Sequence, residues 1–372
     1  MKVDWLIIGA GFTGAVLAER IATQLNKRVL IVDRRNHVGG NAYDYYNEQG
    51  VLVHKYGPHI FHTNSQMVWE YLSQFTEWRP YFHRVLAMVD GIKVPIPINL
   101  NSLYKLFPPK YAGRLEDVLI NSYGYGTKVP ILKLLKSTDG EMQFLANYIY
   151  EKVFYNYTLK QWEFRPEDLD ESVTGRVPVY ISRDDRYFQD RYQGIPKHGY
   201  AALFKRMLFH PNIKILLNTD YQEIEDAVSF NKMIFTGPID EYFNYLYGPL
   251  PYRSLRFKSV NLGVEWHQEV GTVNYPNEYD YTRITEQKHL TGQQYSGTTL
   301  IIEYPQAYKP GKNDPYYPIP RSENQERYLL YAEEARKLKN TVLFAGRLAD
   351  YKYYNMDQAV ARAIHVFKGI AS

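Results

Sequence analysis

The chain has 372 residues, of which 45% are hydrophobic and 23% charged, so its composition is that of a globular protein and its length predicts two or three domains. The 44 basic and 40 acidic residues are too balanced for a protein that binds a nucleic-acid backbone, and no apolar run approaches the ~20 residues of a membrane span. The absence of cysteine excludes disulfides, thiolate nucleophiles and cysteine metal sites, and we expect a cytoplasmic protein without a metal centre.

A dinucleotide-binding pattern occupies the first 33 residues. An apolar run from Leu6 ends in Gly9, Gly11 and Gly14 at Gly-x-Gly-x-x-Gly spacing, a helical pattern follows over 12–25, and a second apolar strand ends at Asp33. The first glycine permits a tight turn, the second lets backbone approach a pyrophosphate, and the third lets helix and strand pack closely. Asp33 would bind a ribose 2′-hydroxyl, and Phe12 and Thr13 lie between the glycines that face the cofactor.

The residues after Asp33 indicate which dinucleotide is bound. Arg34 and Arg35 follow directly, and then comes a second glycine pair with Gly40 and Asn41, where a nicotinamide enzyme would continue into a crossover helix. More backbone contacts along one extended cofactor favour FAD over NAD. Arg34 could instead meet a 2′-phosphate, so NADP is the alternative at this stage.

The middle of the chain changes character several times. A helical pattern from residue 64 presents one apolar face, a hairpin is predicted over 84–94, and helical periodicity dominates 100–157 with breaks at Pro108-Pro109 and at residues 124–126. Residues 158–194 show no clear period. A long aromatic-rich connection of this kind is more often a functional loop than a spacer.

From Ile195 a second portion of the nucleotide-binding domain is expected. It contains a helix over 200–209, a strand over 213–217 and the segment 232–238, and then alternating strands from 254, including 259–264 and 298–304. A strand at 341–345 and a helix over 356–367 close the chain. The N-terminus of that last helix, near Asn355 and Met356, would favour negative charge on a ligand, as on the N1–O2 edge of a flavin; a simple packing helix is the alternative.

Together these elements predict an α/β fold with a discontinuous Rossmann-like FAD-binding domain, an inserted helical domain and an antiparallel β-sheet domain. The predicted boundaries are 1–64, 195–250 and 335–372 for the FAD-binding domain, 100–194 for the helical domain with a mobile substrate loop, and 65–99 with 251–334 for the sheet domain.

Several separated segments identify a family resemblance. They are RRNHVGGNA at 34–42, YGPHIFHT at 56–63, YTLKQW at 157–162, YTRI at 281–284, and GRL at 346–348 with YYNMD at 353–357. In this order and over nearly the whole length, the chain resembles the bacterial UDP-galactopyranose mutases, whereas amine oxidases share only the first signal. The resemblance implies FAD, a helical and a sheet domain around a cleft, and a homodimer.

The resemblance also assigns site residues. Arg176 and Arg283 resemble the arginines that hold the substrate diphosphate, and His59 lies near flavin N5. The substrate-binding residues that it implies are Tyr157, Thr158, Trp162, Tyr187, Tyr317 or its neighbour Tyr316, Tyr353 and Asn355. The expected cofactor-binding residues are Gly9, Gly11, Phe12, Thr13, Gly14, Asp33, Arg34, Gly40, Asn41, His59, Ile60, Gly346, Arg347, Tyr353 and Met356. Some members have aspartate where this chain has Asn355, so only a hydrogen-bonding role is expected there.

The implied reaction interconverts UDP-galactopyranose and UDP-galactofuranose without net electron transfer, supplying galactofuranose for cell-surface glycans. No side-chain nucleophile with an adjacent base is evident in the sequence, and the resemblance implies that N5 of reduced FAD forms a covalent adduct with sugar C1. The expected partners are UDP-galactose and a cellular reductant such as NAD(P)H or a reductase. An amine-oxidase type of flavoenzyme and a nucleotide-sugar binding protein without turnover are the competing hypotheses.

Overall fold

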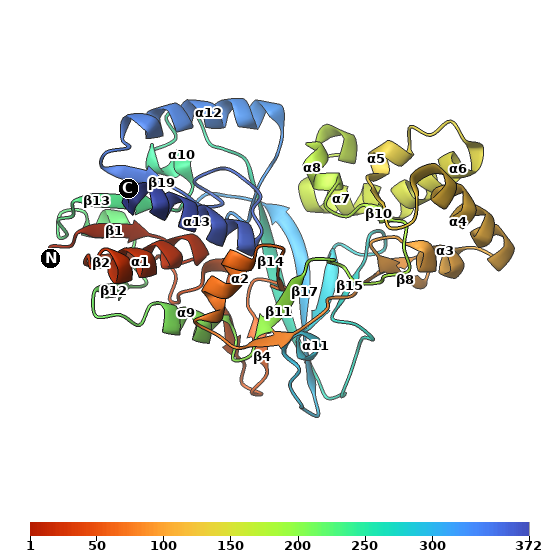
Figure 1. Cartoon of the computed structure of the whole chain (residues 1–372), viewed down its shortest axis with the longest axis horizontal. Helices are drawn as coiled ribbons and strands as arrows, with labels where there is room; N and C mark the ends of the chain where they lie inside the picture. Colours follow the sequence, from red (N-terminus) through yellow and green to blue (C-terminus); the bar gives the residue numbers. More distant parts are fainter. Residues whose placement is uncertain (372) are drawn as a thin grey trace.

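The computed structural model describes residues 1–371, and a five-stranded parallel sheet forms its nucleotide-binding half (Figure 1). The strand order is β12-β2-β1-β13-β19, and every neighbouring pair is parallel. The strands come from three stretches of the chain: β1 (Trp5–Ile8), β2 (Val29–Val32), β12 (Ile213–Leu216), β13 (Lys232–Phe235) and β19 (Val342–Phe344). The discontinuous α/β domain predicted from the sequence is thus the fold observed.

Helices cover one face of this sheet because their apolar residues recur on one side. The covering helices are α1 (Phe12–Gln24), α2 (Gln66–Ser73), α9 (Tyr200–Met207) and α13 (Met356–Ala371), which share a single buried core. The opposite face packs on smaller elements, including the 3₁₀ turn Tyr221–Ile224, α10 (Ile239–Tyr242) and the end of α12 (Ser322–Lys337). Both chain ends lie at this half of the molecule (Figure 1).

A seven-stranded sheet stands in the middle of the molecule. Its order is β18-β14-β17-β16-β15-β7-β8. The strands are β18 (Tyr317–Pro318), β14 (Tyr252–Leu262), β17 (Thr298–Ala307), β16 (Arg283–Glu286), β15 (Thr272–Asn274), β7 (Val85–Val89) and β8 (Ile92–Ile96). All neighbours are antiparallel except β15 and β7, because the β7–β8 hairpin comes from a distant part of the chain and joins the edge in the same direction as β15. The predicted antiparallel sheet therefore contains one parallel pair.

The helical region has its own buried core and lies at the far side of the seven-stranded sheet (Figure 1). It contains α3 (Leu100–Leu106), α4 (Pro109–Tyr123), α5 (Ile131–Leu134), α6 (Gly140–Ile149), a π-helical turn at Tyr150–Tyr155, and α7 (Asn156–Trp162). Side-chain caps fix two of these starts, since Asn99 accepts from the Ser102 amide and Asp139 from the Met142 amide. The helices break at Pro108 and Gly124, as the sequence predicts.

The segment 158–194 differs from its expected irregularity. Its first residues belong to α7, and it also contains the 3₁₀ turn Pro166–Asp168, α8 (Glu171–Thr174), and β10 (Val179–Tyr180), which pairs with β9 (Lys128–Val129). At its end β11 (Tyr192–Pro196) lies between β5 (Phe61–Thr63) and β6 (Trp78–Pro80). These elements are too short for a periodic pattern to show, because seven residues make only about two helical turns.

The remaining elements are the hairpin of β3 (Asp44–Tyr46) and β4 (Leu52–His54), the 3₁₀ turn Gly40–Ala42, and α11 (Gln287–Thr291). Within residues 1–371 no helix has both the length and the apolar character needed to cross a membrane.

Candidate active site

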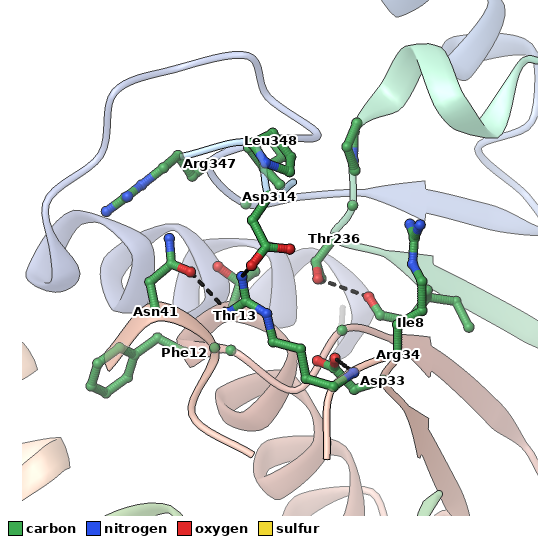
Figure 2. A pocket seen from close by; sticks show the side chains of 18 of the residues that line it. Ile8, Phe12, Thr13, Asp33, Arg34, Asn41, Thr236, Asp314, Arg347 and Leu348 are labelled. Atoms are coloured by element: carbon green, nitrogen blue, oxygen red, sulfur yellow. Dashed lines mark hydrogen bonds and ion pairs between the residues drawn. The ribbon is translucent and has the colours of Figure 1, made fainter. Parts of the chain in front are cut away.

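A cavity of about 600 Å³ lies at the carboxyl ends of β1, β2 and β13, where a parallel sheet binds its ligands (Figure 2). It is lined by twelve of the residues predicted to bind the cofactor: Gly9, Gly11, Phe12, Thr13, Asp33, Arg34, Gly40, Asn41, His59, Gly346, Arg347 and Met356. Three others are placed elsewhere. Gly14 lies behind the turn, and Ile60 and Tyr353 line the neighbouring cavity described below.

The glycine turn leaves space that side chains would fill. Gly9 has a φ of +101°, and a Cβ there would lie 2.1 Å from Thr236 Oγ1, which itself donates to the Ile8 carbonyl across the floor of the cavity (Figure 2). A Cβ on Gly14 would lie 2.0 Å from the Gly9 oxygen, so this glycine permits the close approach of α1 to β1. Bare backbone at the start of α1 therefore fits a pyrophosphate.

Charges at one end of this cavity discriminate between dinucleotides. Asp33 accepts hydrogen bonds from the amides of Ala10 and Arg35 at 2.8 and 2.9 Å, which fixes its carboxylate beside the turn. Arg34 pairs with Glu241 at 2.7 Å and with Asp220 at 3.5 Å. Since both carboxylates would repel a 2′-phosphate and already neutralise Arg34, the geometry disfavours the NADP alternative.

At the opposite end of the cavity lies Arg347 (Figure 2), which with His59 and Met356 also lines a second cavity. The Arg347 guanidinium donates to the carbonyls of Tyr354 and Tyr316, and no carboxylate among residues 1–371 pairs with it. Burial lowers the pKa of Arg347. A half-buried cation without a carboxylate partner, at the junction of two cavities, favours an anionic group on a ligand.

His59 is held at the same junction by its own backbone. Its amide donates to His54 Nδ1 at 3.1 Å, and its carbonyl accepts from the Tyr200 hydroxyl at 3.0 Å. Its Nδ1 lies 2.9 Å from the Gly57 carbonyl, so Nδ1 must carry the proton and Nε2 is left as an acceptor. Burial lowers the pKa of His59 to about 4, and the imidazole is therefore neutral at pH 7.

The second cavity has a volume of about 870 Å³ and lies between the seven-stranded sheet, α7 and the start of α13. Most of the predicted substrate residues line it: Tyr157, Arg176, Tyr187, Arg283, Tyr317, Tyr353 and Asn355. Thr158 and Trp162 do not. Trp162 is buried behind the wall, with its ring 6.0 Å from that of Tyr317 and 5.8 Å from that of Tyr353, so it supports the two tyrosines.

Arg283 is fixed by an acid that the sequence analysis missed. Its Nε and one terminal nitrogen both lie 2.9 Å from Glu303 Oε2, across the pairing of β16 with β17. Burial disfavours the charged form of Arg283, but the Glu303 carboxylate outweighs it and holds the pKa of Arg283 above its ordinary value. A lone acid inside the apolar strand 298–307 was the available signal, because a buried carboxylate needs a partner.

Arg176 reaches the cavity from the connection after α8. Its guanidinium donates to the Tyr353 carbonyl at 3.1 Å and to Asn355 Oδ1, and it stacks over the Tyr353 ring at 3.9 Å. In the described part of the chain it has no carboxylate partner, because Asn355 offers a neutral amide oxygen. Its positive charge is therefore available to a ligand, in contrast to that of Arg283.

Half-buried tyrosines supply hydroxyl donors to this cavity. Burial raises the pKa values of Tyr157, Tyr187 and Tyr317, so all three stay protonated at neutral pH. Tyr317 lines the cavity, whereas Tyr316 packs among Tyr56 and Phe257 and is 4% exposed. The geometry therefore favours Tyr317 over its neighbour as the ligand contact.

Histidines that the sequence analysis did not single out complete one wall. His62 pairs with Asp190 at 2.9 Å and stacks on Phe188, and His83 also faces the cavity, beside Tyr187. Burial lowers the pKa of His83 to about 3. Within residues 1–371 no group of three or more histidines and acids is placed to hold a metal ion.

Comparison with known proteins settles the family. A family model described as UDP-galactopyranose mutase matches residues 152–353, and one described as an NAD(P)-binding Rossmann-like domain matches residues 7–75. A probable UDP-galactopyranose mutase of Klebsiella pneumoniae is 36% identical over 366 residues, which cover 96% of this chain and 92% of the relative. The chain belongs to the UDP-galactopyranose mutase family.

The chain is also similar to a second mutase and to a solved structure. A dTDP-fucopyranose mutase of Escherichia coli is 34% identical over 368 residues, covering 96% of each chain. A crystal structure of reduced UDP-galactopyranose mutase superposes with a TM-score of 0.77 at 17% identity, covering 99% of this chain and 95% of the other, and this likeness concerns the fold. Membership of the mutase family confirms the predicted class of isomerase and implies a flavin cofactor, which the first cavity fits.

Proposed function

We propose that this member of the family interconverts UDP-galactopyranose and UDP-galactofuranose, with FAD in the first cavity and the nucleotide sugar in the second. The observation that carries the proposal is the convergence of Arg176 and Arg283 on a polar cavity that shares His59, Arg347 and Met356 with the dinucleotide cavity. A substrate bound there would have its diphosphate between two guanidinium groups and its sugar beside the cofactor. Planar guanidinium groups suit phosphate oxygens and stay charged at all working pH values.

The residues of the second cavity would position the substrate and neutralise charge. When bound and reduced in the first cavity, where Gly11, Thr13 and Asp33 would hold it, FAD would supply a nucleophilic nitrogen for the anomeric carbon of the sugar. Arg176 and Arg283 would stabilise the diphosphate as it leaves C1 and keep it in place for its return. Tyr187, Tyr317 and Tyr353 would donate hydrogen bonds to the same oxygens, and Tyr157 would stack on the nucleobase, a contact worth ~1–3 kcal/mol.

The wider assignments follow from the family and remain part of the proposal. The FAD-binding domain would comprise residues 1–64, 195–250 and 335–372, the helical domain 100–194, and the sheet domain 65–99 and 251–334. We expect a homodimer whose flavin is reduced by NAD(P)H or a reductase, and whose product supplies galactofuranose to cell-surface glycans.

A second candidate substrate is the dTDP-fucose pair, because the Escherichia coli relative of that name aligns over nearly the full length of both chains. dTDP-fucose lacks the 6-hydroxyl of galactose and the 2′-hydroxyl of ribose and carries a methyl group on its base, but both nucleotide sugars present the same diphosphate to the arginines. The family model described as UDP-galactopyranose mutase, and relatives of that name in Klebsiella pneumoniae and Mycoplasma genitalium, favour the first substrate.

One assay tests both candidates. Purified protein with FAD is incubated with UDP-galactofuranose or with dTDP-fucofuranose, with and without dithionite, and the pyranose forms are separated by chromatography. The proposal predicts conversion of the UDP sugar only after reduction. Conversion by the oxidised flavoprotein, or preferential conversion of the dTDP sugar, would contradict it.

Variants separate catalysis from folding in the same assay. Arg176→Met should lose nearly all turnover while the protein keeps its flavin absorbance. Arg327→Met is the matched control. Arg327 lies on α12, away from both cavities, and its guanidinium donates to the Pro249 carbonyl, so this variant should keep full turnover.

A further inference from the structure

Arg253 on β14 is a buried cation that lines neither cavity. It is 2% exposed and is among the largest fully buried side chains of the described residues. Its Nε donates to the Gln161 carbonyl at 2.8 Å and a terminal nitrogen donates to the Lys160 carbonyl at 3.3 Å. The other terminal nitrogen pairs with Glu163 Oε1 at 2.7 Å.

These acceptors belong to the end of α7. The last carbonyls of a helix have no partner within the helix and carry the negative end of its dipole, so a buried cation beside them is stabilising. Glu163, with a φ of +61°, ends α7 in the left-handed conformation and turns its carboxylate to the same guanidinium. The Arg253 side chain thus donates hydrogen bonds to two of the last carbonyls of α7, the helix that bears Tyr157.

The backbone of Arg253 holds a second wall of the substrate cavity. Arg253 is paired with Tyr317 in the register of β14 and β18, and its carbonyl accepts from the Tyr316 amide at 2.9 Å. Tyr317 in turn lies 4.8 Å, ring to ring, from Tyr353. Arg253 therefore connects the helix of Tyr157 to the strand of Tyr317.

Other contacts attach α7 to the loop beside the same sheet. Lys160 Nζ donates to the Tyr275 carbonyl at 2.7 Å, and the Asn156 side chain donates to that of Asn277 at 2.9 Å. Although α7 continues the chain of the helical region, it is thus also attached to the seven-stranded sheet and its loops. The contact through Arg253 differs from these two, because Arg253 is also paired with β18, the strand that carries Tyr317.

We infer that Arg253 is a positioning residue for the nucleotide end of the substrate, which acts through Tyr157 and Tyr317 without touching the ligand. The inference rests on the proposed function for the identity of that ligand. Without the guanidinium, α7 would keep its fold but lose its fixed distance from β18. Binding of the nucleotide should then weaken, whereas the flavin, which lies in the other cavity, should be unaffected.

The test compares Arg253→Met and Arg253→Lys with the matched control Arg79→Met. Arg79 also donates to the last turn of a helix, at the Leu290 carbonyl of α11, but lies outside both cavities. The dissociation constant for UDP is measured by calorimetry on the flavoprotein, together with KM, kcat and the flavin midpoint potential. Because displaced binding groups lose affinity steeply, Arg253→Met should raise Kd and KM about tenfold or more.

The remaining readouts distinguish positioning from stability alone. Arg253→Lys should fall between Arg253→Met and the native protein, since an ammonium can reach one carbonyl, and the midpoint potential should not move in any variant. A merely structural role predicts a lower melting temperature with unchanged Kd and KM. If Arg253→Met does not fold, Glu163→Gln, at a side chain 61% exposed, should still raise Kd for UDP about two- to fivefold.

Each outcome decides the inference. Native protein that binds UDP, with Arg253→Met binding it equally well, overturns the inference and leaves the proposed function intact; where Arg253→Met does not fold, equal binding by Glu163→Gln does the same. Native protein that does not bind UDP overturns both. Weakened UDP binding in Arg253→Met, with Arg79→Met unchanged, supports the inference.

Discussion

Replacing Arg283 by methionine should destabilise the protein far more than the same change at Arg176. The Glu303 side chain is 3% exposed and both of its contacts with Arg283 are 2.9 Å long, so loss of the guanidinium leaves a buried carboxylate without its charged partner. Breaking a buried ion pair costs ~3–5 kcal/mol, and because the Arg283 side chain is still 25% exposed towards the cavity we expect the lower end, ~3 kcal/mol. Arg176 is exposed and has no acid partner, so Arg176→Met should change stability by less than ~1 kcal/mol.

A double variant tests whether the unpaired Glu303 carboxylate causes the loss of stability. Arg283→Met with Glu303→Leu removes both charges, and since buried pairs replaced by apolar groups are often neutral in stability, it should recover most of the ~3 kcal/mol. Turnover should stay lost, because in the proposed function the Arg283 guanidinium binds the diphosphate. Stability is measured as the urea midpoint by circular dichroism at a fixed FAD concentration, and turnover by the chromatographic assay.

Two results would refute the argument. If Arg283→Met is no less stable than Arg176→Met, or if the double variant is no more stable than Arg283→Met, the pair does not carry the assigned energy. If the double variant regains turnover, Arg283 does not hold the diphosphate.

Three further predictions concern the loop, the glycine turn and pH. Asn355→Asp gives Arg176 an ionic partner worth up to ~1 kcal/mol, so calorimetry should show UDP binding about two- to fivefold weaker; equal or tighter binding would show that the charge of Arg176 is not what the ligand uses. Gly14→Ala places a Cβ 2.0 Å from a backbone oxygen and should abolish flavin retention on gel filtration, whereas Gly140→Ala, with open space around it, should retain flavin fully. Burial lowers the pKa values of several histidines to about 3 or 4. Below pH ~6.5 the unfolded chain therefore binds protons at these histidines that the native state does not bind. Each such histidine lowers the free energy of unfolding by up to ~1.4 kcal/mol per pH unit as the pH falls. Asp44 acts in the opposite direction, because burial raises its pKa to about 6 and the native state therefore binds one proton before the unfolded chain does. Since the histidines outnumber it, the urea midpoint should fall between pH 7 and pH 5. An unchanged or higher midpoint at pH 5 would contradict this prediction. The histidines concerned are His37, His54, His59 and His83.

The nucleotide-binding half could be predicted because its signals are local. Gly9, Gly11 and Asp33 lie within one strand–helix–strand unit, and their spacing alone fixes a turn that the structure reproduces. The predicted helix over 12–25 and the observed α1 differ by one residue. Short-range geometry of this kind needs no knowledge of the rest of the fold.

The substrate cavity could be predicted only in part, because its walls meet through long-range pairing. Glu303 is set opposite Arg283 by the register of β16 with β17, which no local pattern specifies. Trp162 was expected beside the ligand because it shares a motif with Tyr157, but in a helix their side chains point to different faces, and Trp162 packs behind Tyr317 and Tyr353. A sequence motif predicts which segment lies near the ligand but not which of its side chains point towards the ligand.

The two arginines assigned to the diphosphate are physically unlike, and the difference suits a leaving group that must return. Arg283 is held by Glu303, so its position is fixed, while the Glu303 carboxylate offsets part of its positive charge. Arg176 has only neutral acceptors, so its full charge is available, and it lies on the connection predicted from the sequence to contain a mobile substrate loop. Since the attraction between charges grows as water leaves, a fixed arginine would define where the diphosphate lies, and the second arginine would bind strongly only once the cavity has closed.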